Sequence, residues 1–219
     1  MALENATGEM RFQSELLKQE HAVSLEFALF IREKLQSVYC IPSASCSTKW
    51  NGLIFVGRGP YQGGIFRFQL TLPALFPHVT YPFNLKFTSS VYHPAVNQAT
   101  GDIDANLLKF TCVDQCHAYK VISYAKEILE ETDILHFTNC VSSHICTEYA
   151  SNQEAFFNNV FNCVRQSREA IFDILPYDSH NISFTPWNPT LHDALRKRIC
   201  ESHLDRSCDV LSFVFNRCK

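Results

Sequence analysis

Residues 59–72 read Gly-Pro-Tyr-Gln-Gly-Gly-Ile-Phe-Arg-Phe-Gln-Leu-Thr-Leu. Turn-forming residues fill the first half, and apolar and polar side chains alternate in the second half. In an extended chain the two kinds of side chain separate onto two faces: Phe66, Phe68, Leu70 and Leu72 on one, and Arg67, Gln69 and Thr71 on the other. This alternation predicts a half-buried antiparallel strand.

The flanking sequence predicts further strands and a first helix. Short apolar runs at residues 53–56 and 85–87 are typical of strands, and Pro73, Pro77 and Pro82 mark strand ends. The Tyr81–Pro82 bond is a candidate for the cis form. A helical stripe lies within residues 15–36 and consists of Val23, Phe27, Phe30, Ile31 and Leu35. Together these features predict an α+β fold with an antiparallel meander packed on the first helix.

Periodicity fails over residues 88–117, which predicts a long and functional loop. Helical stripes return at two places. The stripe at residues 119–131 is expected to contain Val121, Ile122, Ala125, Ile128 and Leu129. The stripe at about 152–174 begins where Ser151 to Glu154 fits a capping box. The second stripe is expected to contain Phe156, Phe157, Val160, Phe161, Val164 and Ile171. Asn188 followed by Pro189 predicts the start of a last helix. We expect a flexible segment at 1–14, a domain at 15–175 and a carboxyl-terminal extension at 176–219.

Composition narrows the class of protein. The 219 residues carry a formal net charge of −3, which does not favour binding to nucleic acid. The sequence contains no run of 18 or more apolar residues, so we expect no membrane span. Residues 1–12 are polar and do not resemble a signal peptide, so we expect a cytoplasmic protein. The ten cysteines are then expected to be mostly reduced thiols.

Several motifs together resemble the core of ubiquitin-conjugating enzymes (E2 enzymes) over roughly residues 15–132. They occur in the family's order and spacing: Trp50-Asn51-Gly52, Gly59 to Phe66, Pro73, Phe76-Pro77, Pro82, Phe87, Tyr92-His93-Pro94 and Gly101-Asp102-Ile103. The resemblance implies the E2 fold, an α+β fold with an N-terminal helix, a four-stranded antiparallel meander and C-terminal helices. It also implies that His93 is an architectural hydrogen-bonding residue and that Pro94 sets the start of the active-site loop.

Two residues depart from the pattern of active E2 enzymes. Ala95 stands where the family has an asparagine that stabilises the oxyanion, and Asp104 stands where the family has the catalytic cysteine. Loss of one such donor costs on the order of 100- to 1000-fold in rate. A carboxylate is also a poorer nucleophile than a thiolate. We therefore expect a non-catalytic E2 variant, with no cofactor and no metal.

Two alternatives use other cysteines. Cys112 or Cys116 could replace the nucleophile, but each lies several residues away and would be misplaced by far more than an ångström. A misplacement of one ångström alone lowers the rate about 100-fold. Zinc is a second alternative, with Cys112, Cys116 and His117 or with Cys140, His144 and Cys146 as ligands. Neither spacing matches a regular structural zinc site, so we favour ordinary loop thiols.

The block from Asn181 to Asp193 is similar to the fused toes family, which also lacks the cysteine, and so is Val121 to Ile128. The cysteine count and the divergent tail favour its crossbronx branch. This resemblance implies an adaptor in vesicle trafficking that binds a Hook-type coiled-coil adaptor and a Hook-interacting protein, with an Akt-type kinase as a further candidate partner. The alternative is a non-catalytic partner of an active E2 enzyme in ubiquitin chain formation.

The extension holds the candidate partner-binding residues Trp187, Phe213 and Phe215. Trp187 is either an exposed binding anchor or a clamp that packs the following helix on the core, and we favour the clamp. The run Arg196 to Arg198 is expected to be a solvated helix face. The apolar tail at 210–215 either docks on the core or forms an interaction edge.

Overall fold

The computed structural model describes residues 2–74, 76–77, 83–103, 117–134, 141–173 and 180–202, with side chains described from residue 13 onwards. The chain divides into two compact units, residues 1–183 and residues 184–219. Asp104, Cys112, Cys116, Cys140, Phe213 and Phe215 lie outside the described residues, as does the Tyr81–Pro82 bond. The structure has a cis peptide bond at Phe76–Pro77.

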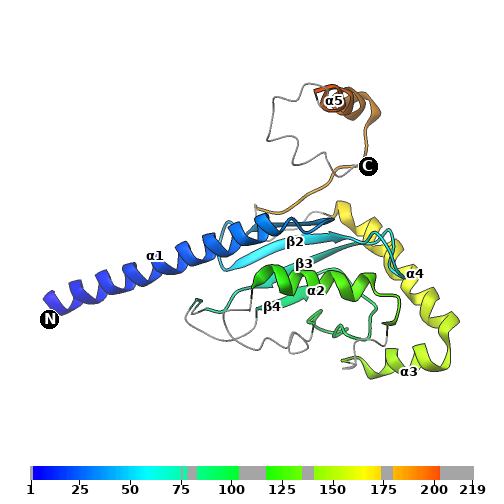
Figure 1. Ribbon diagram of the computed structural model, residues 1–219, viewed down its shortest axis with the longest axis horizontal. Helices are drawn as coiled ribbons and strands as arrows, with labels where there is room; N and C mark the ends of the chain where they lie inside the picture. The colour runs from blue at the N-terminus through cyan, green and yellow to red at the C-terminus, as the bar shows by residue number, and fades with distance from the viewer. Residues whose placement is uncertain are drawn as a thin grey trace. The chain divides into compact units, whose positions relative to one another are not determined.

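The first unit contains a sheet and most of the helices (Figure 1). In chain order the elements are α1 (Ala2–Glu33), β1 (Val38–Pro42), β2 (Lys49–Phe55), β3 (Ile65–Thr71), β4 (Asn84–Phe87), α2 (Ala118–Glu130), α3 (Ser143–Ser151), α4 (Gln153–Glu169) and the 3₁₀ helix η4 (Ala170–Phe172). The strands are antiparallel and lie in the order β1-β2-β3-β4. The predicted four-stranded antiparallel meander is therefore confirmed.

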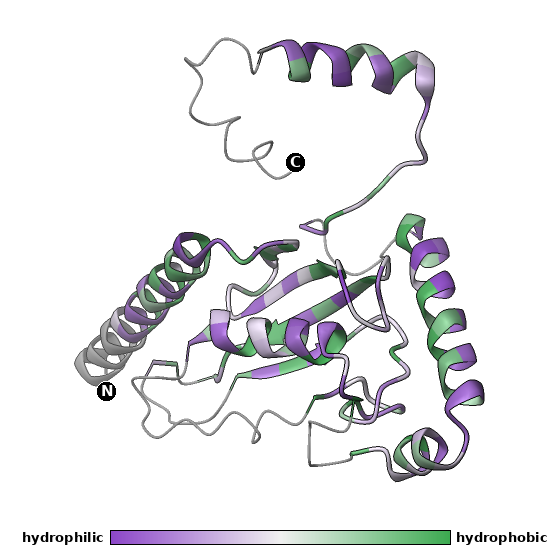
Figure 2. Ribbon diagram, turned by 45° about the vertical axis from the view of Figure 1, so that its right-hand side comes forward, coloured by the Kyte–Doolittle hydropathy of each residue, from purple (hydrophilic) through white to green (hydrophobic). Residues whose placement is uncertain are grey.

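The alternation of residues 65–72 positions the core. Phe66, Phe68, Leu70 and Leu72 are at most 2% exposed. Leu70 pairs with Trp50 on β2 and with Leu85 on β4, so three strands turn apolar side chains to the same face. Figure 2 shows the resulting change between hydrophobic and hydrophilic residues along the strands.

Helix α1 packs on this face through its second half. Val23 and Phe30 are buried there, and the ring of Phe27 contacts that of Trp50 edge-on at 5.2 Å between centroids. The helix is longer than predicted, because it begins at Ala2, and residues 2–14, expected to be flexible, continue it. Its first half extends beyond the sheet (Figure 1).

Helix α2 matches its predicted stripe closely. All five predicted positions are fully buried: Val121, Ile122, Ala125, Ile128 and Leu129. The start of α2 is held by a residue that the sequence did not mark. The buried carboxylate of Glu26 on α1 accepts a hydrogen bond from the Ala118 backbone N–H at 2.6 Å and lies 3.2 Å from His117 Nδ1. This contact joins α1 to α2.

The helix predicted at about 152–174 is present as α4 and η4, but its predicted cap and part of its predicted apolar stripe were wrong. Helix α3 precedes it and was not predicted, because Ile145 is its one buried residue among those described and it has no apolar stripe. Asn152, rather than Ser151, caps α4, since its side chain accepts a hydrogen bond from Ala155 N–H. Phe157 and Phe161 are 44% and 68% exposed. Each follows a buried residue by one position, about 100° around the helix, so the two rings miss the core.

Within the described residues, none of the helices carries an apolar stretch long enough to cross a membrane.

Candidate functional site

The segment 92–103, which we call the His93 loop, follows the sheet and is organised around a buried imidazole. The His93 side chain is fully buried, and its Nδ1 accepts a hydrogen bond from the Ala95 N–H at 3.0 Å. Its ring lies 5.7 Å from that of Tyr61. Burial lowers the pKa of His93 to about 3, so the imidazole is neutral near pH 7. His93 has the geometry of the predicted architectural residue.

Neighbouring elements satisfy the carbonyl groups of the His93 loop. The Tyr61 hydroxyl donates to the Tyr92 carbonyl. The Ser142 N–H donates to the Pro94 carbonyl at 3.0 Å, and the Ser142 hydroxyl donates to the Val96 carbonyl at 2.8 Å. Backbone bonded in this way gains little freedom without losing several contacts at once. The loop is thus a fixed part of the core.

The second half of the loop reverses at Gly101. The Gly101 N–H donates to the Asn97 carbonyl at 2.8 Å, and the Gly101 carbonyl accepts from Phe87 N–H at 2.8 Å. Its φ is +78°, and a Cβ atom there would lie 2.1 Å from the Phe87 carbonyl oxygen. Only glycine fits both the angle and the close approach. Ile103 then pairs with Val96 as the chain reaches the position of Asp104.

The side chains on this loop offer little chemistry. Ala95 is 1% exposed, and its methyl group occupies the place that the resemblance assigns to an amide donor. The nearby thiol of Cys163 accepts from the Tyr92 N–H at 3.4 Å and donates to the Ser90 carbonyl at 3.3 Å. Burial raises the pKa of Cys163, which disfavours the thiolate. Cys163 is therefore a structural thiol.

Helix α3, which the sequence did not reveal, braces the same loop. The Tyr92 hydroxyl donates to the Glu148 carboxylate, and the Asn159 side chain on α4 donates to the same carboxylate at 3.2 Å. No sequence signal pointed to Glu148, because its partners lie 56 and 11 residues away.

The structure bears differently on the two zinc patterns. Cys112, Cys116 and Cys140 lie outside the described residues, and Cys146 is disulfide-bonded, so it has no thiolate to offer as a ligand. Across the residues that are described, no three His, Cys, Asp or Glu side chains gather closely enough to hold a metal ion.

Sequence reasoning also misplaced Arg67. It was expected on the solvent face of β3, yet it is 8% exposed. Its guanidinium donates to the Ile182 carbonyl at 2.7 Å and to the Ile171 carbonyl at 3.0 Å. Burial lowers the pKa of Arg67, and nearby Asp173 opposes that change. Arg67 thereby ties the chain that follows α4 to the outer face of the sheet.

The second unit contains α5 (Pro189–Ser202), whose start was predicted correctly. The Asn188 side chain accepts a hydrogen bond from Thr190 N–H at 3.1 Å, and Pro189 is the first helical residue. The residues Arg196 to Arg198 are exposed, as expected for a solvated face.

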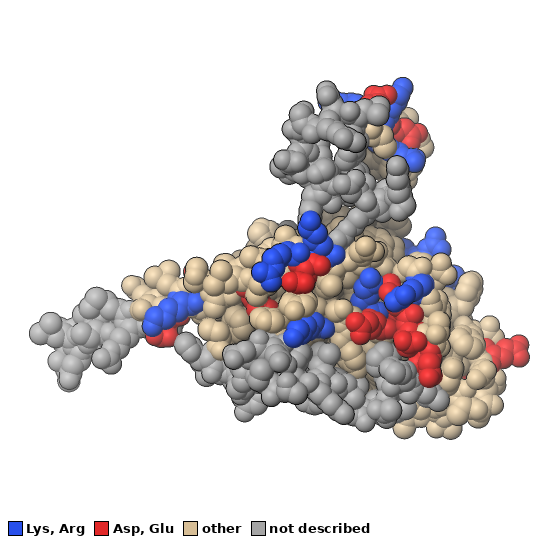
Figure 3. Space-filling model, viewed as in Figure 1, with Lys and Arg blue, Asp and Glu red and all other residues tan. Residues whose placement is uncertain are grey.

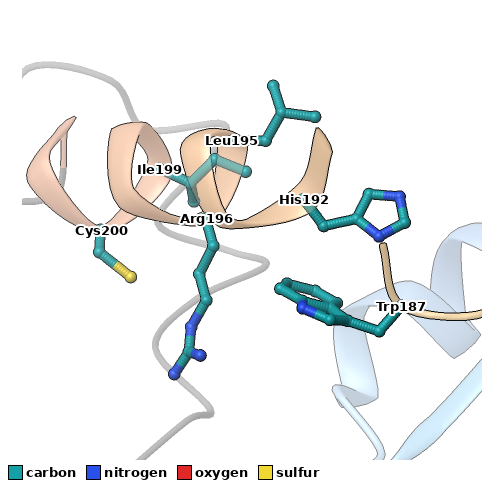
Figure 4. A pocket seen from close by; sticks show the side chains of 6 residues that line it. All are labelled: Trp187, His192, Leu195, Arg196, Ile199 and Cys200. Atoms are coloured by element: carbon teal, nitrogen blue, oxygen red, sulfur yellow. The ribbon is translucent and has the colours of Figure 1, made fainter. Parts of the chain in front are cut away.

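Trp187 belongs to the second unit, where its side chain is 56% exposed, and the core clamp stays a prediction. Its indole lies 5.0 Å from the His192 ring (Figure 4). Arg196 and Cys200 leave α5 on the side of Trp187 and line a cavity of about 400 Å³ with it. Leu191 and Leu195 are 62% and 52% exposed. The unit therefore presents large apolar side chains to its surroundings.

Comparison with known proteins agrees with this geometry. The family model of the ubiquitin-conjugating enzymes matches residues 22–164. The chain belongs to the ubiquitin-conjugating enzyme family. Two solved structures support the fold: the E2 domain of a Toxoplasma gondii ubiquitin-conjugating enzyme, and a Plasmodium yoelii protein assigned to the same class. Their TM-scores are 0.55 and 0.57 at 18% and 21% identity, covering 66% and 69% of this chain and 98% and 93% of theirs.

Within the ubiquitin-conjugating enzyme family the chain is related to AKT-interacting proteins. It is 32% identical over 183 residues to AKT-interacting protein homolog B of Xenopus laevis, and 30% identical to AKT-interacting protein of Homo sapiens. Both alignments cover 82% of this chain and 61% of the relative. The chain thus spans about three fifths of the length of the curated relatives that it matches.

Proposed function

We propose that this chain is a catalytically inactive E2 variant that acts in the cytoplasm as a protein–protein adaptor. Ala95 carries the proposal. It sits buried in a loop whose backbone is fixed by His93, Ser142 and Gly101, yet it brings a methyl group where transfer chemistry requires a donor. The sequence adds Asp104 at the position of the cysteine.

The two changes act on different steps of ubiquitin transfer. Without a thiol at position 104, no exchangeable thioester forms there. Without a donor at position 95, the oxyanion is less stabilised, by about 3 to 4 kcal/mol. The negative charge of Asp104 would oppose the same oxyanion. Either change alone would severely slow ubiquitin transfer. Together they leave binding to other proteins as the remaining role.

The partners follow from resemblance and from the exposed residues of the second unit. The relatives are named for interaction with AKT. The fused toes resemblance adds a Hook-type coiled-coil adaptor and a Hook-interacting protein, which we propose as partners together with an Akt-type kinase. Trp187 supports such contact, because large exposed aromatic side chains are favoured at interface hot spots. Phe213 and Phe215 remain candidates for the same surface, and membership of the crossbronx branch stays a prediction.

The catalytic half of the proposal is tested by incubating the chain with ubiquitin-activating enzyme, ATP and ubiquitin. No adduct that a reductant removes is expected on a non-reducing gel. The matched variant Ala95→Asn with Asp104→Cys tests whether those two positions are what is missing, and we expect it to form the adduct. An adduct on the natural chain that disappears when a single cysteine is replaced would overturn the proposal.

The adaptor half is tested by pull-down with Hook carboxyl-terminal segments and with a panel of active E2 enzymes. Trp187→Ala is expected to weaken the Hook interaction at least 10-fold. Phe172→Ala, a control that removes a 46% exposed ring from the first unit, is expected to leave it unchanged. Binding only to an active E2 enzyme would favour a role in ubiquitin chain formation instead.

A further inference from the structure

Helix α5 carries an apolar face that the described residues leave largely exposed. Leu191, Leu195 and Ile199 follow one another at intervals of four residues, which places them on one side of the helix. Leu191 and Leu195 are 62% and 52% exposed, and Ile199 is half-buried. Figure 2 shows hydrophobic positions set between hydrophilic ones along α5. We call these three side chains the α5 stripe.

The cavity beside Trp187 extends the same apolar surface. Leu195 and Ile199 line this cavity of about 400 Å³ together with Trp187 and His192 (Figure 4). A pocket with apolar and aromatic walls suits hydrophobic side chains. Charge does not point to another kind of ligand, because acidic and basic side chains lie beside one another on the described part of the face drawn in Figure 3. The surface therefore calls for an apolar occupant.

The sequence that follows α5 contains a segment with a matching pattern. Residues 210–215 read Val-Leu-Ser-Phe-Val-Phe. In an extended chain Leu211, Phe213 and Phe215 share one side. Residues 203–219 lie outside the described part of the chain, so the pattern and its spacing come from their sequence. Residues 184–219 form one compact unit, which contains both this segment and α5.

The segment and the helix agree in length and in spacing. Helix α5 has 14 residues and is about 21 Å long. The extended segment 210–215 covers about 20 Å. Neighbouring residues of the α5 stripe are about 6 Å apart along the helix axis, and alternate residues of an extended chain are about 6.7 Å apart. The apolar side of the segment therefore matches the α5 stripe residue by residue.

The connection between them allows the chain to reverse. Residues 203–209 separate the end of α5 at Ser202 from Val210. Fully extended, this connection spans about 23 Å, which is ample for a turn beside the last residues of the helix. A tether this short also raises the effective concentration of the segment to about the millimolar range. The segment therefore outcompetes a second copy of the chain at micromolar concentrations.

We propose that residues 210–215 pack along the α5 stripe as an intramolecular cover. The segment runs back along the helix, so that Phe213 lies opposite Leu195 and Phe215 reaches toward Trp187. The cover forms in the unbound chain and requires neither ubiquitin nor a partner. A partner that contacts the α5 stripe must first displace it, and the inference rests on the proposed adaptor function in this last step alone.

The test uses the full chain and the fluorescence of its two tryptophans. Trp50 is fully buried, so quenching by acrylamide reports on Trp187. Phe213→Ser combined with Phe215→Ser should raise the Stern–Volmer quenching constant about 2- to 3-fold, because the tethered contact is lost. The matched control combines Val210→Ser with Val214→Ser on the other side of the extended segment, and should change the constant by less than about 1.3-fold.

Methyl NMR of the full chain detects the contact directly. Nuclear Overhauser effects should join the Leu195 methyl groups to the rings of Phe213 and Phe215 at low micromolar concentration. The absence of these effects would overturn the proposal. Equal quenching of the natural chain and the double phenylalanine variant would do the same, as would an equally large increase in the valine control.

Effects that appear only at high micromolar concentration would assign the cover to a second copy of the chain and would also overturn the proposal. Circular dichroism melts of the variants exclude misfolding of the first unit as the cause of a change in quenching. Because no Hook segment is used, failure of this test leaves the adaptor proposal standing, and failure of the Hook pull-down leaves the cover standing.

Discussion

The His93 loop and the segment 187–199, which we call the Trp187 segment, place their side chains in opposite ways. In the loop, His93 and Ala95 are buried and the backbone is bonded to the sheet and to Ser142. In the Trp187 segment, Trp187, Leu191 and Leu195 are each more than half exposed. Replacement of loop residues should therefore lower the free energy of unfolding. Replacement in the Trp187 segment should instead weaken binding to other molecules.

The sharpest test of this contrast is Gly101→Ala. A side chain at φ +78° is strained, and its Cβ would meet the Phe87 carbonyl, so we expect a loss of about 3 kcal/mol in the free energy of unfolding. Urea denaturation measures it. Gly63→Ala is the matched control, because φ there is +82° but nothing lies within 4 Å of the added Cβ. Equal losses in both variants would mean that the approach to Phe87 contributes nothing.

A second test uses pH. His93 has a pKa of about 3 when folded, below its ordinary value of about 6.5, so the unfolded chain takes up a proton that the folded chain refuses. Stability from this group is present above pH 6.5 and is lost as the pH falls. Between pH 8 and pH 5 we expect a loss of about 2 kcal/mol.

Replacing His93 by Asn isolates this contribution, since Asn keeps an acceptor for the Ala95 N–H but does not titrate. Urea denaturation at a series of pH values should show a flatter dependence for this variant than for the natural chain. Parallel curves would mean that His93 is protonated in the folded protein and that the buried, neutral description of the loop is mistaken.

The smallest expected effects lie in the Trp187 segment. Asn188→Ala removes the cap of α5 and should reduce protection of the Thr190 to Leu195 amides from hydrogen exchange by about 1 kcal/mol, without altering the sheet. Trp187→Ala should change the free energy of unfolding by less than about 0.5 kcal/mol. A much larger loss for Trp187→Ala would show that the indole packs as core and would remove the contrast between the two regions.

Patterns with a short period were predicted well from the sequence. The alternation over β3 and the stripe of α2 describe which face of one element is apolar, and Asn188 with Pro189 describes a local cap. In each case the deciding partners lie within a few residues, so the sequence spacing contains the information. The predicted burial of Phe157 and Phe161 was wrong, because a helix rich in apolar residues offers more than one possible stripe and packing selects one of them.

By itself, the sequence determined the antiparallel meander, the buried faces of β3 and α2, and the absence of both a donor at Ala95 and a thiol at Asp104. Only the tertiary structure decided what Arg67 and Glu148 do. Arg67 is buried because carbonyl groups 104 and 115 residues away accept its hydrogen bonds, and a buried charge is tolerated only with such partners. Glu148 is held by Tyr92 and Asn159, which lie 56 and 11 residues away, and no local pattern records such partners.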